Sequence, residues 1–258
     1  MKKKVFTAMG LMSGTSMDGI DLSLIKSNGY DEFTTILDKY FEFDKNLQRK
    51  LITFRDQLST TNDLEKYSKE LQALEREFTL FHVKILDEIL TYSNYKIDLI
   101  GFHGQTVLHN SEKKISKQIG DGKLLSQLTK KIVINNFRTN DLKKDGQGAP
   151  LTPIFHKLLK RIFKVNDVTF VNIGGIVNIT TLLNDSSMRG TDIGPGMCLI
   201  DRWVRQKTKK NYDKEGIIAS TGNVDKESLD LLLKNFYKKE KILNKGPTQS
   251  FDTKYFDF

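Results

Sequence analysis

A glycine-rich segment near the N-terminus has the residue types that bind phosphate. It lies between two strand-like stretches and reads Gly14-Thr15-Ser16-Met17-Asp18-Gly19. A tight hairpin turn can direct several backbone N–H groups into one concavity, which binds phosphate oxygens. Hydroxyl groups at Ser13, Thr15 and Ser16 add donors, and Asp18 is a candidate ligand for Mg²⁺ through water. The alternative is an ordinary hairpin, and the segment is not a P-loop, because no G-x-x-x-x-G-K-[ST] pattern occurs.

A second glycine-rich segment carries a carboxylate. It reads Gly190-Thr191-Asp192-Ile193-Gly194-Pro195-Gly196 and is expected to form a turn into a helix over residues 199–207. Asp192 at the mouth of such a turn is a candidate general base, and the helix N-terminus behind it would favour anionic oxygens. The alternative is that Asp192 is a simple helix N-cap.

Polar side chains also follow a predicted buried strand over residues 97–102. His103-Gly104-Gln105-Thr106 comes next, and the amide of Gln105 and the hydroxyl of Thr106 suit sugar hydroxyls. His103 could equally be a buried, satisfied histidine. Arg138 can bind a carboxylate through two hydrogen bonds, with Asp141 as an alternative, purely structural partner.

Other kinds of catalytic site have little support in the sequence. His109 and His156 complete no metal-binding set, and the single cysteine, Cys198, excludes both zinc-type spacing and an internal disulfide. No G-x-S-x-G nucleophile elbow occurs, so hydrolysis through a serine or cysteine nucleophile is not indicated.

The elements that would position these residues alternate between strand and helix, which predicts an α/β fold. Strands are expected near residues 4–12, 20–25, 33–43, 97–102, 115–119, 132–135, 168–173 and 176–183. An apolar stripe from Leu64 to Ile89, at spacings of three and four, predicts one long amphipathic helix with Asn62 or Asp63 as its N-cap. Shorter helices are expected over 124–128, 154–163 and 199–207, with a loop over 138–153.

Composition indicates a globular protein without identifying its partner. Hydrophobic residues make up 38% of the 258 residues, which is enough for a core. The net charge of +9 comes from lysines scattered along the chain, so it reads as a solvated surface and predicts no nucleic-acid partner. No A-x-A-like cleavage site follows the basic start, and no apolar run has the length of a membrane helix, so we expect a cytoplasmic protein with no membrane association.

Taken in order, these segments resemble the anhydro-N-acetylmuramic acid kinase family from about residue 5 to about residue 205. The motifs that carry the resemblance are Gly10 to Asp21, His103-Gly104-Gln105-Thr106, Ile119-Gly120-Asp121-Gly122, Phe137-Arg138 with Asp141, Gly146 to His156, Asn172 to Thr180, and Asp192 with Gly194-Pro195-Gly196.

The resemblance implies a two-lobed actin-like ATPase or sugar-kinase fold, related to ribonuclease H, with mixed sheets flanked by helices and a cleft between the lobes. We expect residues 1–130 to form the N-terminal lobe with the first phosphate-binding hairpin. Residues 131–258 would then form a second lobe with the second phosphate motif. Because family members continue into a further glycine-rich, adenosine-binding segment, this second lobe is expected to be incomplete, with weak ATP binding as the consequence.

The resemblance also implies a reaction, in which water opens the 1,6-anhydro bond of the sugar and the freed O6 receives the γ-phosphoryl group of ATP. The product would be N-acetylmuramic acid 6-phosphate, in peptidoglycan recycling and amino-sugar catabolism. ATP and Mg²⁺ are the implied cofactors, the sugar is the other small-molecule partner, and relatives are often homodimers. By the family pattern Asp192 is the general base. The phosphate-binding residues are Gly14, Thr15, Ser16, Met17, Asp18, Gly19, Ile20 and Asp21, helped by Gly194, with Asp18 toward the metal. The sugar side is assigned to Gln105, Thr106, Arg138 and Asn178.

Two substitutions depart from the family pattern beside the expected base. Ile193 stands where the family usually has Thr, and Met197 where it usually has Asn, so two polar groups are lost. A non-catalytic sugar- or nucleotide-binding protein is therefore the alternative, and turnover of ATP with the anhydro sugar separates the two. Another sugar or acetate kinase is disfavoured by the segments 146–151 and 172–180. Nucleic-acid binding would require salt-dependent affinity for DNA or RNA.

Overall fold

The computed structural model describes residues 3–92, 95–184 and 187–243. The chain divides into two compact units, residues 1–165 and residues 166–258. We expected a boundary at residue 130. The division falls later because β6 hydrogen-bonds to β4 and so belongs to the first sheet. In the described ranges no helix is both long and apolar enough to span a membrane.

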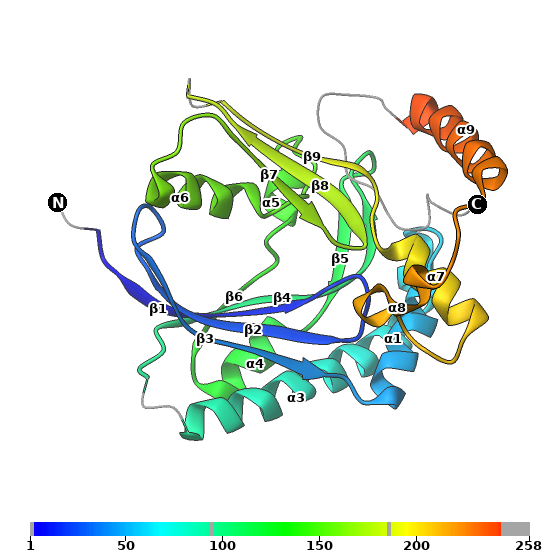
Figure 1. The fold of residues 1–258 in the computed structure, drawn as a ribbon. Coiled ribbons are helices and arrows are strands. Elements are labelled where there is room, and N and C mark those ends of the chain that lie inside the picture. Colours follow the sequence, from blue (N-terminus) through cyan, green and yellow to red (C-terminus); the bar gives the residue numbers. More distant parts are fainter. Residues whose placement is uncertain (1–2, 93–94, 185–186, 244–258) are drawn as a thin grey trace. The chain divides into compact units, whose positions relative to one another are not determined.

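The first unit is built on a six-stranded mixed sheet (Figure 1). Its strands are β1 (Phe6–Ser13), β2 (Gly19–Ser27), β3 (Phe33–Glu42), β4 (Leu99–Asn110), β5 (Ile115–Ile119) and β6 (Ile132–Asn135). The order is β3-β2-β1-β4-β5, with β6 beside the first half of β4. β1 pairs antiparallel with β2 and parallel with β4, so the β1–β2 turn and the middle of β4 meet at one end of the sheet.

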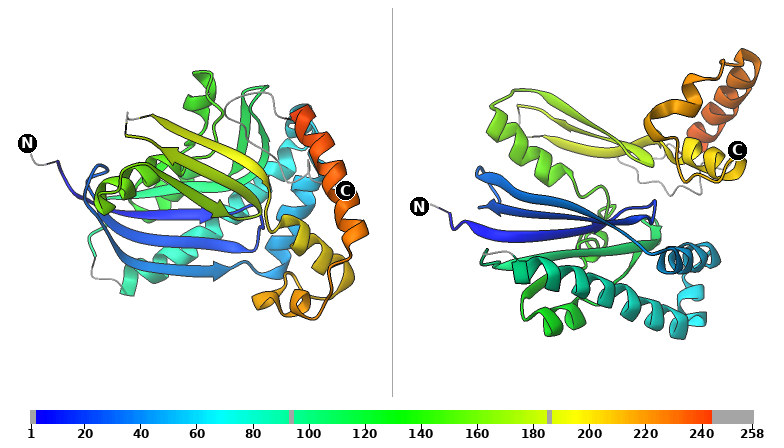
Figure 2. Two further views of the ribbon diagram at one scale, coloured as in Figure 1. Left: turned by 45° about the horizontal axis from the view of Figure 1, so that its top comes forward. Right: turned by 60° about the horizontal axis from the view of Figure 1, so that its bottom comes forward.

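Helices α1, α3 and α4 lie on one face of this sheet (Figure 2). The helices of the unit are α1 (Lys45–Gln57), α2 (Asn62–Lys66), α3 (Ser68–Tyr92), α4 (Gly122–Thr129), α5 (Thr139–Lys143) and α6 (Pro153–Phe163). Alternate residues of β1 and β2, such as Met9, Leu22 and Leu24, point into the core between the sheet and these helices. Phe78 of α3 and Phe102 of β4 are fully buried there.

Local sequence sets the helix boundaries. The Asp44 carboxylate accepts hydrogen bonds from the N–H groups of Asn46 and Leu47 and so begins α1. The Asp121 carboxylate does the same for α4 through the Leu124 N–H. The α1 helix was not predicted. The helix expected over 62–89 is interrupted at Tyr67, which separates α2 from α3, and the N-cap of α2 is Thr61, so neither expected cap holds that position.

The second unit has a three-stranded antiparallel sheet, in the order β7-β8-β9, followed by helices. Its elements are β7 (Val168–Ile173), β8 (Ile176–Leu182), β9 (Met188–Pro195), α7 (Cys198–Lys207), the 3-10 turn η1 (Lys214–Gly216), α8 (Ile217–Ser220) and α9 (Lys226–Leu243). The predicted strands β7 and β8 are confirmed. The turn expected at Asp192 is wrong, since Asp192 lies inside β9. The α/β class is confirmed.

Candidate functional site

The β1–β2 turn is fixed by a methionine whose side chain is buried in the core. Met17 has φ of +55° and no exposed surface, and its N–H donates to the carbonyl oxygen of Gly14 at 3.2 Å. A methionine with positive φ is unfavourable unless packing compensates, and here the side chain joins the core. The result is a fixed turn whose outer residues, Thr15, Ser16 and Asp18, are exposed.

Gln105 ties this turn to β4. The Ser13 hydroxyl lies 2.6 Å from Gln105 Oε1 and 3.0 Å from the carbonyl oxygen of Gly19, so its one proton serves two acceptors. Gln105 Nε2 donates to the carbonyl oxygen of Gly14 at 2.9 Å. Gln105 is fully buried, and its amide supports the β1–β2 turn. Its predicted contact with the sugar stays a prediction.

Two carboxylates crowd together beside the turn. Asp21 lies opposite Tyr40 in the β2–β3 register, and the Tyr40 hydroxyl hydrogen-bonds to Asp18. Partial desolvation and, after it, the Asp18 carboxylate raise the pKa of Asp21. Burial, followed by Asp18, Glu42 and Asp21, raises the pKa of Tyr40 to about 12. Carboxylates that repel one another in this way suit a hard divalent cation, which would relieve the repulsion.

A bulge in β4 places His103 and Gly104. Leu11 pairs with Phe102 and Ser13 pairs with Gln105, so β4 carries one more residue than β1 at this point. Gly104 has φ of +75°, and a Cβ there would lie 2.4 Å from the carbonyl oxygen of Ile119. The segment predicted to follow the strand therefore lies within it, because β4 continues against β5 as far as Asn110.

His103 and Arg138 form a buried pair. His103 Nδ1 lies 2.7 Å from the carbonyl oxygen of Gly104, and this contact requires a proton on Nδ1. Nε2 is then the acceptor for Arg138 Nη2 at 2.8 Å and Nε at 3.2 Å. Burial, and then the positive charge of Arg138, lower the pKa of His103 to about 4. The imidazole is therefore neutral and orients the guanidinium.

Arg138 also holds the glycine-rich loop that follows it. Arg138 Nη1 donates to the carbonyl oxygen of Gly148 at 2.7 Å, and the N–H of Gly148 donates to Asp141 Oδ2 at 2.7 Å. Thr106, the remaining sugar-side candidate in this unit, accepts a hydrogen bond from Gln118 Nε2 at 3.2 Å. Arg138 and Asp141 thus bind the two backbone polar groups of the same residue, Gly148.

In the second unit Asp192 of β9 and Asn178 of β8 lie opposite each other on adjacent strands. They are direct partners in the β8–β9 register, and Asp192 is 7% exposed. Val177 pairs with Gly194, so Ile193 is the extra residue of a bulge. Bulges of this kind redirect neighbouring side chains and are frequent beside active sites. Ile193 itself is 43% exposed.

The N-terminus of α7 differs from expectation. The N–H of Met197 donates to the carbonyl oxygen of Gly174 at 2.8 Å, and that of Cys198 donates to Gly175 at 3.2 Å. These first amides of the helix are therefore satisfied by the β7–β8 turn. These two N–H groups are therefore not available to bind the anionic oxygens that were expected beside Asp192.

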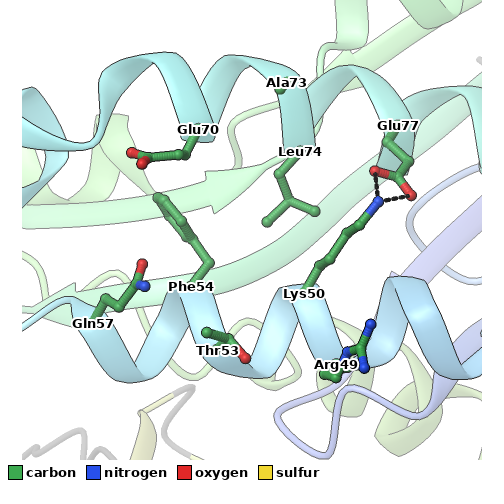
Figure 3. A pocket seen from close by; sticks show the side chains of 9 residues that line it. All are labelled: Arg49, Lys50, Thr53, Phe54, Gln57, Glu70, Ala73, Leu74 and Glu77. Atoms are coloured by element: carbon green, nitrogen blue, oxygen red, sulfur yellow. Dashed lines mark hydrogen bonds and ion pairs between the residues drawn. The ribbon is translucent and has the colours of Figure 1, made fainter.

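A groove of about 430 Å³ lies between α1 and α3 (Figure 3). Its residues are Arg49, Lys50, Thr53, Phe54, Gln57, Glu70, Ala73, Leu74 and Glu77, with Lys50 Nζ 2.8 Å from a Glu77 carboxylate oxygen. None of the predicted site residues lines it, so it is separate from the candidate chemistry.

Within each unit the structure thus groups the predicted residues. In the first unit, Gln105 hydrogen-bonds to the turn within the segment from Gly14 to Asp21, and Arg138 hydrogen-bonds to His103. In the second, Asn178 meets Asp192. The sequence did not predict that Ser13 and Tyr40 support the turn, or that His103 is the partner of Arg138. In the described ranges no cluster of three or more His, Cys, Asp or Glu side chains could hold a metal ion.

Comparison with known proteins adds an independent line of observation. A family model described as anhydro-N-acetylmuramic acid kinase matches residues 6–255. A protein of that name from Pelagibacter ubique is 46% identical over 258 residues, covering 99% of this chain and 68% of its own length. One from Rhizobium etli is 41% identical over 229 residues, covering 85% of this chain and 61% of its own length. The chain thus spans roughly two thirds of the length of these relatives. Among solved structures, an Aquifex aeolicus member of the Ppx/GppA family aligns with 94% of this chain and 63% of its own length, at 11% identity and a TM-score of 0.41.

Proposed function

The chain belongs to the anhydro-N-acetylmuramic acid kinase family, and from this premise we propose that it uses ATP to convert 1,6-anhydro-N-acetylmuramic acid into N-acetylmuramic acid 6-phosphate. Water adds to the anomeric carbon, the bond from that carbon to O6 breaks, and O6 takes the γ-phosphoryl group. ADP leaves, and the proton of the water passes to a base. The observation that carries the proposal is the fixed β1–β2 turn, which resembles the family's phosphate-binding hairpin and exposes Thr15, Ser16 and Asp18.

In the first unit the turn from Gly14 to Gly19 would bind the phosphates of ATP. Its backbone is held by Met17 and Gln105, so the donors are organised before the ligand arrives. Such preorganisation matters because phosphoryl transfer depends mostly on positioning and charge stabilisation. The Ser16 hydroxyl donates to Asp18 Oδ1 at 2.5 Å, which fixes the orientation of that carboxylate.

The carboxylates of Asp18 and Asp21 would hold Mg²⁺, directly or through water. The ion would supply positive charge that neutralises the phosphate oxygens. The oxygen donors and the raised pKa of Asp21 fit this role.

In the second unit Asp192 would be the general base and Asn178 would bind the sugar or the water. Asp192 is buried, which removes competing bulk water, and its strand fixes it opposite Asn178. Thr106 and Arg138 of the first unit would contact the sugar. Arg138 suits the lactyl carboxylate of muramic acid, because a guanidinium binds a carboxylate through two parallel hydrogen bonds.

The test is ADP release by the purified chain with ATP, Mg²⁺ and the anhydro sugar. Release that depends on the sugar and yields the 6-phosphate supports the proposal. ADP release without sugar dependence, or none at all, would contradict it. In the second case, calorimetric titration with the sugar alone would identify the alternative, a binding protein of the same family. The cellular setting that we propose is peptidoglycan recycling in the cytoplasm, with a homodimer as the expected assembly.

A further inference from the structure

Two polar atoms of β8 are buried without a hydrogen-bond partner among the described residues. They are Asn178 Oδ1 and Thr180 Oγ1, and Thr180 has no exposed surface at all. A buried hydroxyl without a partner lowers stability, because its hydrogen bonds to water are lost and nothing replaces them. A position of this kind therefore calls for a specific explanation.

Both atoms belong to the face of the sheet that carries Asp192. Asn178 and Thr180 are two residues apart on β8, so their side chains project to the same side. Asn178 pairs with Asp192 on β9, and Thr180 pairs with Gly190, which has no side chain. Three oxygen-bearing side chains thus share one face of the β8–β9 pair.

The chemistry of these groups specifies what they can bind. The Asn178 oxygen and the Asp192 carboxylate accept hydrogen bonds, whereas the Thr180 hydroxyl can donate or accept. A hydroxyl group, which also donates and accepts, satisfies such a set. If Thr180 only filled space, valine would serve better, since it has the same shape and no polar atom.

We propose that Thr180 and Asn178 together bind a hydroxyl group, of a water molecule or of the sugar, beside Asp192. The proposal rests on the proposed function for the identity of the sugar. It makes Thr180 a binding residue of the reaction and explains why an unpartnered hydroxyl is kept inside the sheet.

The experiment compares Thr180→Val with Thr180→Ser, and with Thr181→Val as a matched control. The Thr181 hydroxyl is on the opposite face, 3.2 Å from that of Thr169. Without ligand, Thr180→Val should have an unchanged or higher Tm than the native chain. Its sugar-dependent kcat/KM should fall at least about tenfold, while Thr180→Ser and Thr181→Val should keep most of theirs. Full turnover of Thr180→Val, or a Tm lower by more than about 4 °C, would overturn the proposal.

A crystal structure gives a readout that does not depend on turnover. We expect a water oxygen or a sugar hydroxyl within about 3.2 Å of both Thr180 Oγ1 and Asn178 Oδ1. Occupancy in crystals grown without sugar identifies water as the source, and occupancy only after soaking identifies the sugar. The absence of any such oxygen in both crystals would refute the site. If the native chain turns nothing over, the Tm comparison and the crystals still decide the matter.

Discussion

Asp192 is the side chain on which the proposed reaction depends most directly. Replacing it by Asn keeps its size and its place in β9 but removes the proton acceptor. We expect kcat for sugar-dependent ADP release to fall about 10²- to 10⁴-fold, the range for loss of a general base. KM for ATP should change little, because the predicted phosphate-binding turn is in the other unit.

Asp167→Asn is the control for this change. The Asp167 carboxylate also lies in the second unit, where it accepts a hydrogen bond from the Asn184 N–H at 2.7 Å, but it is exposed. This variant should keep nearly all of its turnover. An Asp192→Asn enzyme that retained most of its activity would show that another group takes the proton.

His103 should make the stability of the first unit depend on pH. Its pKa is about 4 in the folded chain against the ordinary 6.5, because burial and Arg138 disfavour the imidazolium. Between these values the unfolded chain holds the proton and the folded chain does not. Stability is therefore fully present above pH 6.5 and is lost as the pH falls toward 4. From pH 7.5 to pH 5 the loss amounts to about 2 kcal/mol for this residue.

Urea unfolding at several pH values measures this contribution. His103→Gln, which cannot bind the proton, should lose about 2 kcal/mol less than the native chain between pH 7.5 and pH 5. His82 also makes stability fall in acid, because burial lowers its pKa to about 4 as well. This contribution is the same in the native chain and in His103→Gln, so it does not affect the difference between them. Parallel pH dependences in the two proteins would mean that His103 is protonated in the fold.

The sequence predicted residue types well and their partners poorly. Asp192 and Asn178 stood in separate motifs, and only the strand register makes them neighbours. Gln105 supports a serine 92 positions earlier, and Arg138 contacts a histidine 35 positions earlier. Such pairs are fixed by the order of strands in the sheet, which a single sequence does not contain.

Gly14 and Gly19, at the two ends of the β1–β2 turn, are glycine for different reasons. A Cβ on Gly19 would lie 2.3 Å from the Phe41 carbonyl oxygen and 2.7 Å from the Tyr40 ring, so β3 leaves no room for it. A Cβ on Gly14 would meet nothing closer than 3.8 Å. We expect Gly19→Ala to destabilise the chain by about 2 to 4 kcal/mol. Gly14→Ala should stay within about 0.5 kcal/mol of the native chain but weaken ATP binding, because a phosphate must approach this backbone closely.

Thermal unfolding and ATP titration, carried out on both variants, separate the two effects. The informative result is a Gly14→Ala protein with a native Tm and a raised Kd for ATP. If Gly14→Ala binds ATP as the native chain does, the turn does not hold the phosphates. If Gly19→Ala is as stable as the native chain, β3 is not held against the turn as described.

The helices and strands were predictable where the hydrophobic periodicity was strong and turn-forming residues bounded the segment. The strands of the first hairpin, β7 and β8 follow their patterns. Helix α1 was missed although Leu47, Leu51 and Phe54 recur at helical spacing, because polar residues surround them. The segment around Asp192 was misread as a turn because of its glycines and proline. At the edge of a sheet Pro195 can end a strand, and pairing with β8 outweighs the local propensity.

The molecule as a whole divides its apolar surface unequally. The main buried cluster runs from Met9 to Leu125 and lies entirely within the first unit. In the second unit several large apolar side chains are well exposed, with Ile173 at 61%, Val171 at 59% and Trp203 at 51%. Because burial of apolar surface is the main stabilising term, the first unit should be the more stable.

Trp203, the only tryptophan of the chain, makes this difference measurable. Its fluorescence reports on the second unit, whereas far-UV circular dichroism is dominated by the longer first unit. In urea the fluorescence transition should come at a lower concentration than the dichroism transition, since two units of unequal stability do not unfold as one. Trp203→Phe, which should abolish the fluorescence change and leave the dichroism curve in place, verifies the assignment. Coincident transitions would instead mean that the units unfold together, and the smaller sheet would then owe its stability to the larger one.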